Sequence, residues 1–369
     1  MQINESLCEL WDECNNKQTP LVLWGIGEQC DAYYTILRLA GIKPVCIGDK
    51  DQSKSGIYFK GTPIKSLSEI LLSYQDVNIL LAADGLEEKN ETNFLIKALS
   101  NSSVLKKRNK VNLFCIRNKG TLSAELLTYY RKSKLQRQDF SIISNSCWAF
   151  DIYGYLDVQP RTPTIRMIIW PLHYLKFLEK LDYYLTAPLK FKGNYITPRQ
   201  KYENIHVVAA LDDIDIHFVH DTDFESVYEI WTEGVRKLNR ENLFVIMEDA
   251  HFPLTRAIAE RFDKLPYKNK ILLTPYDYGE IKSVCRYSND KIWLRAVLNI
   301  NHVIRYERFD FVKWLNNGGV GRDFEVKDLC DDLPANYVEW LYSGGMPIYN
   351  RIYELFLYEG RKLPAQSGS

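Results

Sequence analysis

The chain has 369 residues, of which 46% are hydrophobic, and its 47 basic residues balance its 47 acidic ones. This composition excludes an intrinsically disordered chain, which would be poorer in hydrophobic residues and higher in net charge. It also argues against a nucleic-acid partner, because nucleic-acid-binding proteins normally carry a basic excess. At roughly 150 residues per domain, the length predicts about two domains.

The sequence carries no pattern of a targeting or membrane-spanning segment. Its first residues lack the basic and apolar regions of a signal peptide, and no apolar run reaches the ~18 residues of a membrane span. The 8 cysteines include no Cys-x-x-Cys pair, which favours reduced thiols and disfavours a zinc site. We therefore expect a cytoplasmic protein without a metal site.

Residues 1–120 predict a parallel sheet with helices on both faces, because short apolar runs alternate with helical patterns. The runs expected as strands are 21–24, 44–48, 77–82 and 111–116, and the expected helices are 29–39, 67–73 and 91–99. A basic linker helix is expected within 121–139. It would be solvated or would contact anionic groups at a membrane surface.

Residues 140–317 predict a second α/β domain, again from alternating patterns. Its expected strands are 140–144, 164–169, 205–209, 215–219, 243–247 and 270–273, and its expected helices are 171–185, 224–238 and 254–264. The glycine- and asparagine-rich run 316–321 separates this domain from a helical extension at 318–369, with a helix at 349–358. The predicted fold class is α/β, with a Rossmann-like parallel sheet followed by a mixed α/β domain.

A glycine-rich loop follows the first expected strand. Gly25 and Gly27 lie where a dinucleotide-binding loop would let backbone N–H groups approach a phosphate at a helix N-terminus. Cys30 replaces the third glycine of that fingerprint, and Asp49 ends the next strand, where an acid would bind a ribose hydroxyl. The loop is a candidate cofactor-binding site, or a turn with a structural role alone.

This part of the chain resembles the N-terminal Rossmann-like domain of bacterial sugar acyltransferases and related polysaccharide enzymes. The segments that carry the resemblance are Trp24-Gly25-Ile26-Gly27, Ile47-Gly48-Asp49-Lys50-Asp51 and Phe59-Lys60-Gly61-Thr62-Pro63-Ile64. The resemblance implies that the domain binds a nucleotide-sugar or only shapes the subunit.

Polar clusters follow expected strands of the second domain, at the edge where ligand sites of α/β sheets lie. These clusters are Asn145–Cys147, His220–Asp223 and Glu248–His251. The residues predicted to act in catalysis are Cys147, His220, Asp221 and Glu248. The residues predicted to bind substrate are Asn145, Trp148, Arg161, Arg166, His217 and His251.

The second domain also resembles a bacterial family, the domain of unknown function 1919, whose members are often labelled exopolysaccharide-biosynthesis proteins. The segments that carry this resemblance are Phe140–Trp148, Pro163–Ile165, Ile216–His220, Trp231–Asn239, Asn242–Val245 and Phe262–Lys270. The resemblance implies a role in assembling surface polysaccharide, without an established reaction.

We expect a transferase that uses a nucleotide-sugar donor or a saccharide acceptor. In glycosyl transfer, Arg161 or Arg166 would bind the diphosphate of the donor. Asp215, Asp221 or Glu248 would act as the base.

Two alternatives stay open. An acyltransferase would use Cys147 as nucleophile and His220 as base, with Asp221 or Asp223 orienting the imidazole. A scaffold would bind a nucleotide-sugar without turnover and organise other polysaccharide-assembly enzymes at the inner membrane surface. A nicotinamide cofactor is not expected, because nothing beyond the glycine loop points to one.

Overall fold

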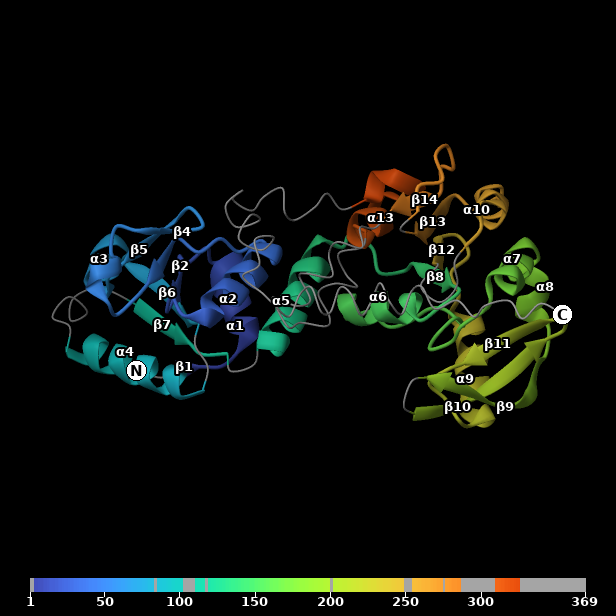
Figure 1. Ribbon diagram of the computed structural model, residues 1–369, viewed down its shortest axis with the longest axis horizontal. Helices are drawn as coiled ribbons and strands as arrows, with labels where there is room; N and C mark the ends of the chain where they lie inside the picture. Colours follow the sequence, from blue (N-terminus) through green and yellow to red (C-terminus); the bar gives the residue numbers. More distant parts are fainter. Residues whose placement is uncertain are drawn as a thin grey trace, which may run out of the picture. The chain divides into compact units, whose positions relative to one another are not determined.

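The computed structural model describes residues 3–82, 85–101, 110–116, 119–199, 202–248, 254–274, 276–286 and 309–325. These residues divide into two compact units (Figure 1). Unit 1 runs as far as Ser123, and unit 2 runs from Ala124 to Arg286 and includes residues 309–325. Within the described ranges, no helix is long and apolar enough to span a membrane.

Unit 1 is built on a seven-stranded sheet with the order β1-β7-β6-β2-β3-β5-β4. The strands are β1 Ile3–Asn4, β2 Leu21–Trp24, β3 Cys46–Gly48, β4 Tyr58–Phe59, β5 Thr62–Lys65, β6 Asp76–Leu81 and β7 Lys110–Phe114. All neighbours are parallel except the β4–β5 pair at one edge. From β2 the chain adds β3 and β5 on one side and then β6 and β7 on the other. This order is doubly wound, and the sheet is parallel as the sequence predicted.

The helices of unit 1 join these strands, and those that overlap 29–39, 67–73 and 91–99 were expected from the sequence. They are α1 Leu7–Trp11, a π-helix at Asp12–Asn16, α2 Glu28–Leu39, a 3₁₀ turn at Gln52–Lys54, α3 Leu67–Ser73 and α4 Gly85–Asn101. Helix α3 begins at a capping box, in which Ser66 and Glu69 each accept the backbone N–H of the other. Gly48 has no room for a side chain, because a Cβ would lie 2.2 Å from the Trp24 ring.

Unit 2 contains a parallel sheet with the order β14-β13-β12-β8 and an antiparallel sheet with the order β11-β10-β9. The strands are β8 Ser141–Ser144, β9 Leu189–Arg199, β10 Tyr202–Leu211, β11 Ile214–Phe218, β12 Leu243–Glu248, β13 Asn269–Thr274 and β14 Val284–Arg286. The helices are α6 Trp148–Leu156, α7 Pro171–Glu179, α8 Leu181–Thr186, α9 Phe224–Lys237, α10 Arg256–Asp263 and α13 Phe311–Asn317. Helix α5, Lys119–Lys134, crosses the boundary between the units.

The parallel sheet of unit 2 has a core on each face. One core joins Ile142, Phe244 and Ile246 to side chains of α6 and α13. The other joins Ile143, Val245 and Met247 to α7, α9, α10 and one face of the antiparallel sheet. Successive residues of β8 and β12 alternate between the two cores, as the pleat of a strand requires.

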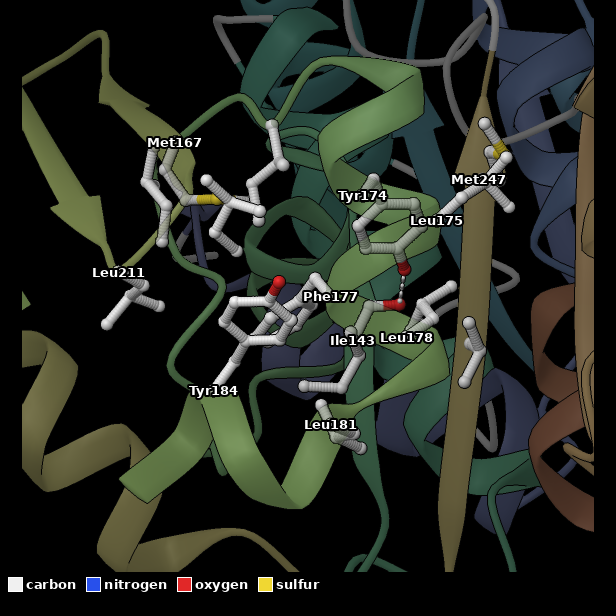
Figure 2. Close-up of a cluster of buried hydrophobic side chains, with 14 of the residues drawn as sticks. Ile143, Met167, Tyr174, Leu175, Phe177, Leu178, Leu181, Tyr184, Leu211 and Met247 are labelled. Atoms are coloured by element: carbon white, nitrogen blue, oxygen red, sulfur yellow. Dashed lines mark hydrogen bonds between the residues drawn. The ribbon is translucent and has the colours of Figure 1, made fainter. Parts of the chain in front are cut away.

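Tyr174 of α7 ties its helix to two strands of the sheet. Figure 2 shows its hydroxyl bonded to the carbonyl oxygen of Ile143 in β8, at 3.0 Å. The same hydroxyl lies 2.9 Å from the carbonyl oxygen of Ile246 in β12. Burial raises the pKa of Tyr174 well above its ordinary value, so the hydroxyl keeps its proton and donates it to these carbonyls in turn.

Two sequence predictions for unit 2 are wrong. Residues 164–169 form no strand, and only Ile168 pairs, as an isolated bridge to His217. Arg166 has a φ of 57°, which breaks the extended conformation there. The helix expected at 171–185 is two helices, because Lys180 has a φ of −132° and a ψ of 44°.

Other elements differ in extent from the prediction. The sequence did not indicate α6 or β9, and β9 carries two lysines, a glycine and an asparagine that dilute its apolar alternation. Residues 318–325 were expected in the C-terminal extension but lie in unit 2, where Val320 pairs with Lys270 of β13. The helix expected at 349–358 lies outside the described residues.

We predict that Tyr174→Phe lowers the free energy of unfolding by about 1–1.5 kcal/mol, because a buried hydrogen bond to the sheet backbone is lost. Urea unfolding would measure this loss. The matched control is Tyr183→Phe, because the Tyr183 hydroxyl bonds to the exposed Asp212 at 2.7 Å. This control should cost less than about 0.5 kcal/mol. Equal losses in the two variants would contradict the prediction.

Candidate functional site

The chain leaves the neighbouring parallel strands β8 and β12 toward opposite faces of the sheet, although the strand order of this sheet does not reverse. We call the carboxyl ends of these two strands the β8–β12 switch point. After β8 the chain forms α6 on one face of the sheet, and after β12 it forms α10 on the other. Ligand sites of open α/β sheets lie outside the carboxyl ends of the strands at such points. The predicted polar cluster Asn145–Cys147 directly follows β8. The predicted cluster that begins at Glu248 starts with the last residue of β12.

The side chain of Asn145 joins the ends of the two strands. Its Nδ2 donates to the carbonyl oxygen of Glu248 at 3.0 Å, and its Oδ1 accepts the backbone N–H of Glu248 at 2.9 Å. The side chain thus extends the β8–β12 ladder by one residue. Asn145 was predicted to bind substrate, but in the structure its amide positions Glu248. Glu248 is 5% exposed.

The turn between β8 and α6 is closed by serine side chains. The Ser146 N–H donates to the Ser144 hydroxyl at 3.3 Å, and the Trp148 N–H donates to the Ser146 hydroxyl at 3.4 Å. Cys147 is the N-cap residue of α6 and is half-buried. The ring of Trp148, which was predicted to bind substrate, packs in the core that joins the parallel sheet to α6, 6.0 Å from the ring of Phe309, and its substrate role stays a prediction.

The two predicted arginines lie in different places. The carbonyl oxygen of Arg161 accepts a hydrogen bond from the hydroxyl of Ser141, the first residue of β8, at 2.6 Å. The backbone of Arg161 therefore lies at the amino end of β8, and its predicted role in binding substrate stays a prediction. Four residues of strand separate the two ends by roughly 10 Å.

Arg166 connects the segment between α6 and α7 to the end of β11. Its Nη2 donates to the carbonyl oxygen of His220 at 2.8 Å and lies 3.2 Å from a carboxylate oxygen of Asp221. These bonds use one nitrogen of the guanidinium fork. The backbone of Arg166 is in the left-handed region, which costs conformational energy for a residue with a side chain. The contacts of Nη2 with the His220 carbonyl and with Asp221 orient the guanidinium of Arg166.

Asp223 has a structural role at the start of α9. Its carboxylate accepts the N–H of Ser226 at 2.8 Å and the hydroxyl of the same residue at 2.7 Å. The hydroxyl and backbone bonds from Ser226 lower the pKa of Asp223. The carboxylate caps the helix, as a helix N-terminus requires.

The segment 168–170 links the switch point to the antiparallel sheet. The Ile169 N–H donates to the carbonyl oxygen of Asn145 at 2.9 Å. Ile168 exchanges two backbone bonds with His217 of β11, at 2.7 and 2.9 Å. Backbone bonds of Ile168 and Ile169 therefore link His217 to Asn145 through a segment that the sequence did not identify.

His217 lies in a network of aromatic rings. Trp170 Nε1 donates to His217 Nε2 at 2.8 Å, and His217 Nδ1 lies 3.2 Å from His206 Nε2. Because an indole nitrogen can only donate, neutral His217 carries its proton on Nδ1 and donates it to His206. Burial, and next the neighbouring His206, lower the pKa of His217 to about 4, so the ring is neutral at physiological pH.

The glycine loop of unit 1 lies at that unit's own switch point, between β2 and β6. Gly25 has a φ of 102°, which favours glycine, whereas Gly27 has an ordinary φ of −82° and caps α2. Asp49 accepts the N–H of Ile26 at 3.3 Å and pairs with the Lys54 ammonium at 3.0 Å. The protein's own carboxylate thus takes a backbone donor that a phosphate would need.

The sequence did not identify three residues of these two regions. Glu91 of α4 is buried beside the glycine loop, where it accepts the Trp24 indole N–H at 3.0 Å and pairs with Lys50 at 2.6 Å. Trp170 and His206 complete the network of His217. All three meet partners distant in the sequence, so no local pattern signals them. His251 lies outside the described residues.

In the part of the chain that the structure describes, no three His, Cys, Asp or Glu side chains are grouped so that they could hold a metal ion.

We predict that Gly25→Ala lowers the free energy of unfolding by about 1–3 kcal/mol, because the positive φ strains any residue with a Cβ. The added Cβ itself has room, 3.7 Å from the carbonyl oxygen of Ala82. Gly27→Ala, the control, should cost less than about 1 kcal/mol. Chemical unfolding followed by circular dichroism tests this, and a larger loss for Gly27→Ala would overturn it.

We predict that acid destabilises the protein through His217. Its pKa is about 4 in the folded state and 6.5 ordinarily, so the unfolded chain takes up the proton first. Stability is therefore full above about pH 6.5 and falls as the pH approaches 4, by up to about 2 kcal/mol at about pH 5. Urea unfolding at several pH values would show a smaller fall in His217→Phe, and an identical fall would contradict the assignment.

Comparison with known proteins assigns residues 119–316 to a protein family. The model of the Domain of unknown function (DUF1919) family matches residues 119–316, which include the β8–β12 switch point. An uncharacterized protein of Haemophilus influenzae is 29% identical over 189 residues, which cover 50% of this chain and 87% of that protein. The chain belongs to the family known as domain of unknown function 1919.

Proposed function

We propose that this protein is a glycosyltransferase of surface-polysaccharide assembly that uses a nucleotide-sugar donor at the β8–β12 switch point. The observation that carries the proposal is Glu248, a buried acid whose backbone Asn145 fixes at the carboxyl end of β12. The resemblance to exopolysaccharide-biosynthesis proteins supports the class of polymer. The β8–β12 switch point supports a ligand site at this edge.

Arg166 is suited to the diphosphate of the donor. Asp221 and the His220 carbonyl orient its guanidinium through one nitrogen, Nη2. The rest of the fork can donate to phosphate oxygens, and arginine binds such groups in a bidentate manner. An orientation set before the ligand arrives lowers the entropy cost of binding.

Glu248 is suited to act as the base. Its carboxylate would take the proton of the acceptor hydroxyl as the hydroxyl oxygen bonds to the anomeric carbon of the donor sugar. The bond from that carbon to the diphosphate oxygen breaks, and the nucleoside diphosphate leaves with the electron pair, held by Arg166. The other candidate bases have different tasks: Asp221 pairs with Arg166, and Asp215 pairs with Lys192 at 2.5 Å.

A second candidate function is acyl transfer, and the position of Cys147 favours it. Cys147 is the N-cap residue of α6, two positions after Asn145, whose side chain bonds to the backbone of Glu248. Helix N-termini favour the thiolate, which is the reactive form of cysteine. In that reaction the thiolate would attack the acyl carbon of a thioester donor, and the donor's thiolate would leave with the electron pair of the broken C–S bond. His220 would then take the proton of an acceptor hydroxyl, whose oxygen would bond to the acyl carbon and release the Cys147 thiolate.

We predict that Glu248→Gln lowers donor turnover at least about 100-fold, with donor affinity within about threefold of the wild type. Arg166→Ala should weaken donor binding about 10- to 100-fold, because charged hydrogen bonds to phosphate are lost. Calorimetry and release of nucleoside diphosphate from uridine-, guanosine- and thymidine-diphosphate sugars measure both effects.

The matched controls are Glu241→Gln and Arg256→Ala, because both side chains are exposed. Both controls should bind and turn over the donor like the wild type. A failure of every nucleotide-sugar to bind would refute the proposal. Loss of activity in Cys147→Ser, with a trapped thioester in the wild type, would favour acyl transfer, whereas donor binding without turnover would favour the scaffold.

A further inference from the structure

The antiparallel sheet of unit 2 has an inner and an outer face. Ile214, Ile216 and Phe218 of β11 point into the core that α9 also joins, so the alternate residues Asp215 and His217 lie on the outer face. This face has no apolar core of its own against it among the clusters that the described residues form.

Two aromatic rings flank His217 on this face. The Trp170 ring lies edge-on to the imidazole with centroids 5.6 Å apart, and the Tyr195 ring lies edge-on to it at 6.1 Å. Trp170 is 38% exposed and Tyr195 is 44% exposed, although both are large and partly apolar. Both rings therefore contact the His217 imidazole and expose aromatic surface to solvent.

The rings are held in place before any ligand arrives. The Trp170 indole is fixed by its bond to His217, which is itself bonded to the buried His206. Tyr195 of β9 lies opposite His206 in the ladder with β10. Rigid aromatic side chains lose little conformational entropy on binding, so a fixed pair favours a stacking ligand.

The polar groups beside the rings indicate the kind of ligand. Lys192 and Asp215 form an ion pair at 2.5 Å and are both partly exposed, so they offer donors and acceptors without net charge. A pyranose ring has a C–H face that packs on the negative face of an aromatic ring, and hydroxyls that bond to such polar groups. A phosphate-bearing ligand would need an excess of cations, which this pair does not supply.

The aromatic pair also adjoins the switch point. Trp170 follows Ile169, whose N–H bonds to the carbonyl oxygen of Asn145. Asn145 in turn holds Glu248. Trp170 is thus the next residue after Ile169, which bonds to Asn145, and the Cα atoms of consecutive residues are about 3.8 Å apart.

We propose that Trp170, Tyr195 and His217 form a saccharide-binding platform that holds the acceptor for the transfer at Glu248. The role as acceptor site rests on the proposed function, whereas saccharide binding stands on the geometry of the platform. The ligand class is an uncharged sugar chain, of which one or two pyranose rings stack on the indole and the phenol.

Binding of hexasaccharides to the full-length protein tests this proposal. The probes are linear hexamers of glucose, N-acetylglucosamine, mannose and galactose, with calorimetry and saturation-transfer NMR as readouts. We expect at least one hexamer to bind, and we expect Trp170→Ala and Tyr195→Ala each to weaken its binding about tenfold or more. Trp170→Phe keeps an aromatic face and should bind within about threefold of the wild type.

The matched control is Tyr228→Ala, because Tyr228 is an exposed aromatic residue of α9, whose Val227 joins the core on the other face of the sheet. This control should bind like the wild type. If no hexamer binds the wild-type protein, or if binding survives loss of both rings, the platform is refuted. Saccharide binding without nucleotide-sugar binding would refute the glycosyltransferase and leave the platform standing.

Discussion

The pairing of β8 with β12 is the constraint on which the rest of unit 2 depends. Each of its two faces belongs to a different core, so the register of this pair decides which side chains are buried where. Several buried polar side chains bond to its backbone, among them the hydroxyl of Tyr174 within the pair and the amide of Asn145 at its carboxyl end. Buried polar groups are costly unless they are bonded, so each of these side chains favours this register over its neighbours.

The two switch points of the chain differ in what occupies them. In unit 1 the carboxylate of Asp49 bonds to the glycine loop and to Lys54. In unit 2 an acid, Glu248, ends β12, and one nitrogen of the Arg166 guanidinium bonds to the end of β11. An acid and an oriented guanidinium are the groups that the proposed transfer from a diphosphate would use. We therefore place the proposed transfer in unit 2.

The short segment Ile168–Trp170 joins the two sheets of unit 2 and brings the platform to the switch point. Its successive residues bond to opposite neighbours, Ile168 to β11 and Ile169 to the end of β8. The next residue, Trp170, places its indole on His217. A movement of this segment would disturb both the Asn145 contact and the aromatic pair, so the proposed saccharide binding and the proposed transfer at Glu248 share one support.

The sequence by itself determined the elements whose period is local. Strand β2 and helix α9 were predicted within a residue of their bounds. A fully buried strand is a continuous apolar run and an amphipathic helix has a periodic one, so neighbouring residues are enough to indicate both. It also placed Asn145, Cys147 and Glu248 at strand ends, since a polar cluster after an apolar strand has a local signature.

Only the tertiary structure decided which of these residues meet. Asn145 and Glu248 are 103 residues apart, and Trp170 and His217 are 47 apart, so no local pattern records either pair. Arg161 and Arg166 are five positions apart in similar sequence surroundings, yet they lie at the amino end of β8 and beside β11. Their separation follows from the backbone turn at Arg166 and the bridge at Ile168, which long-range strand pairing imposes on this segment.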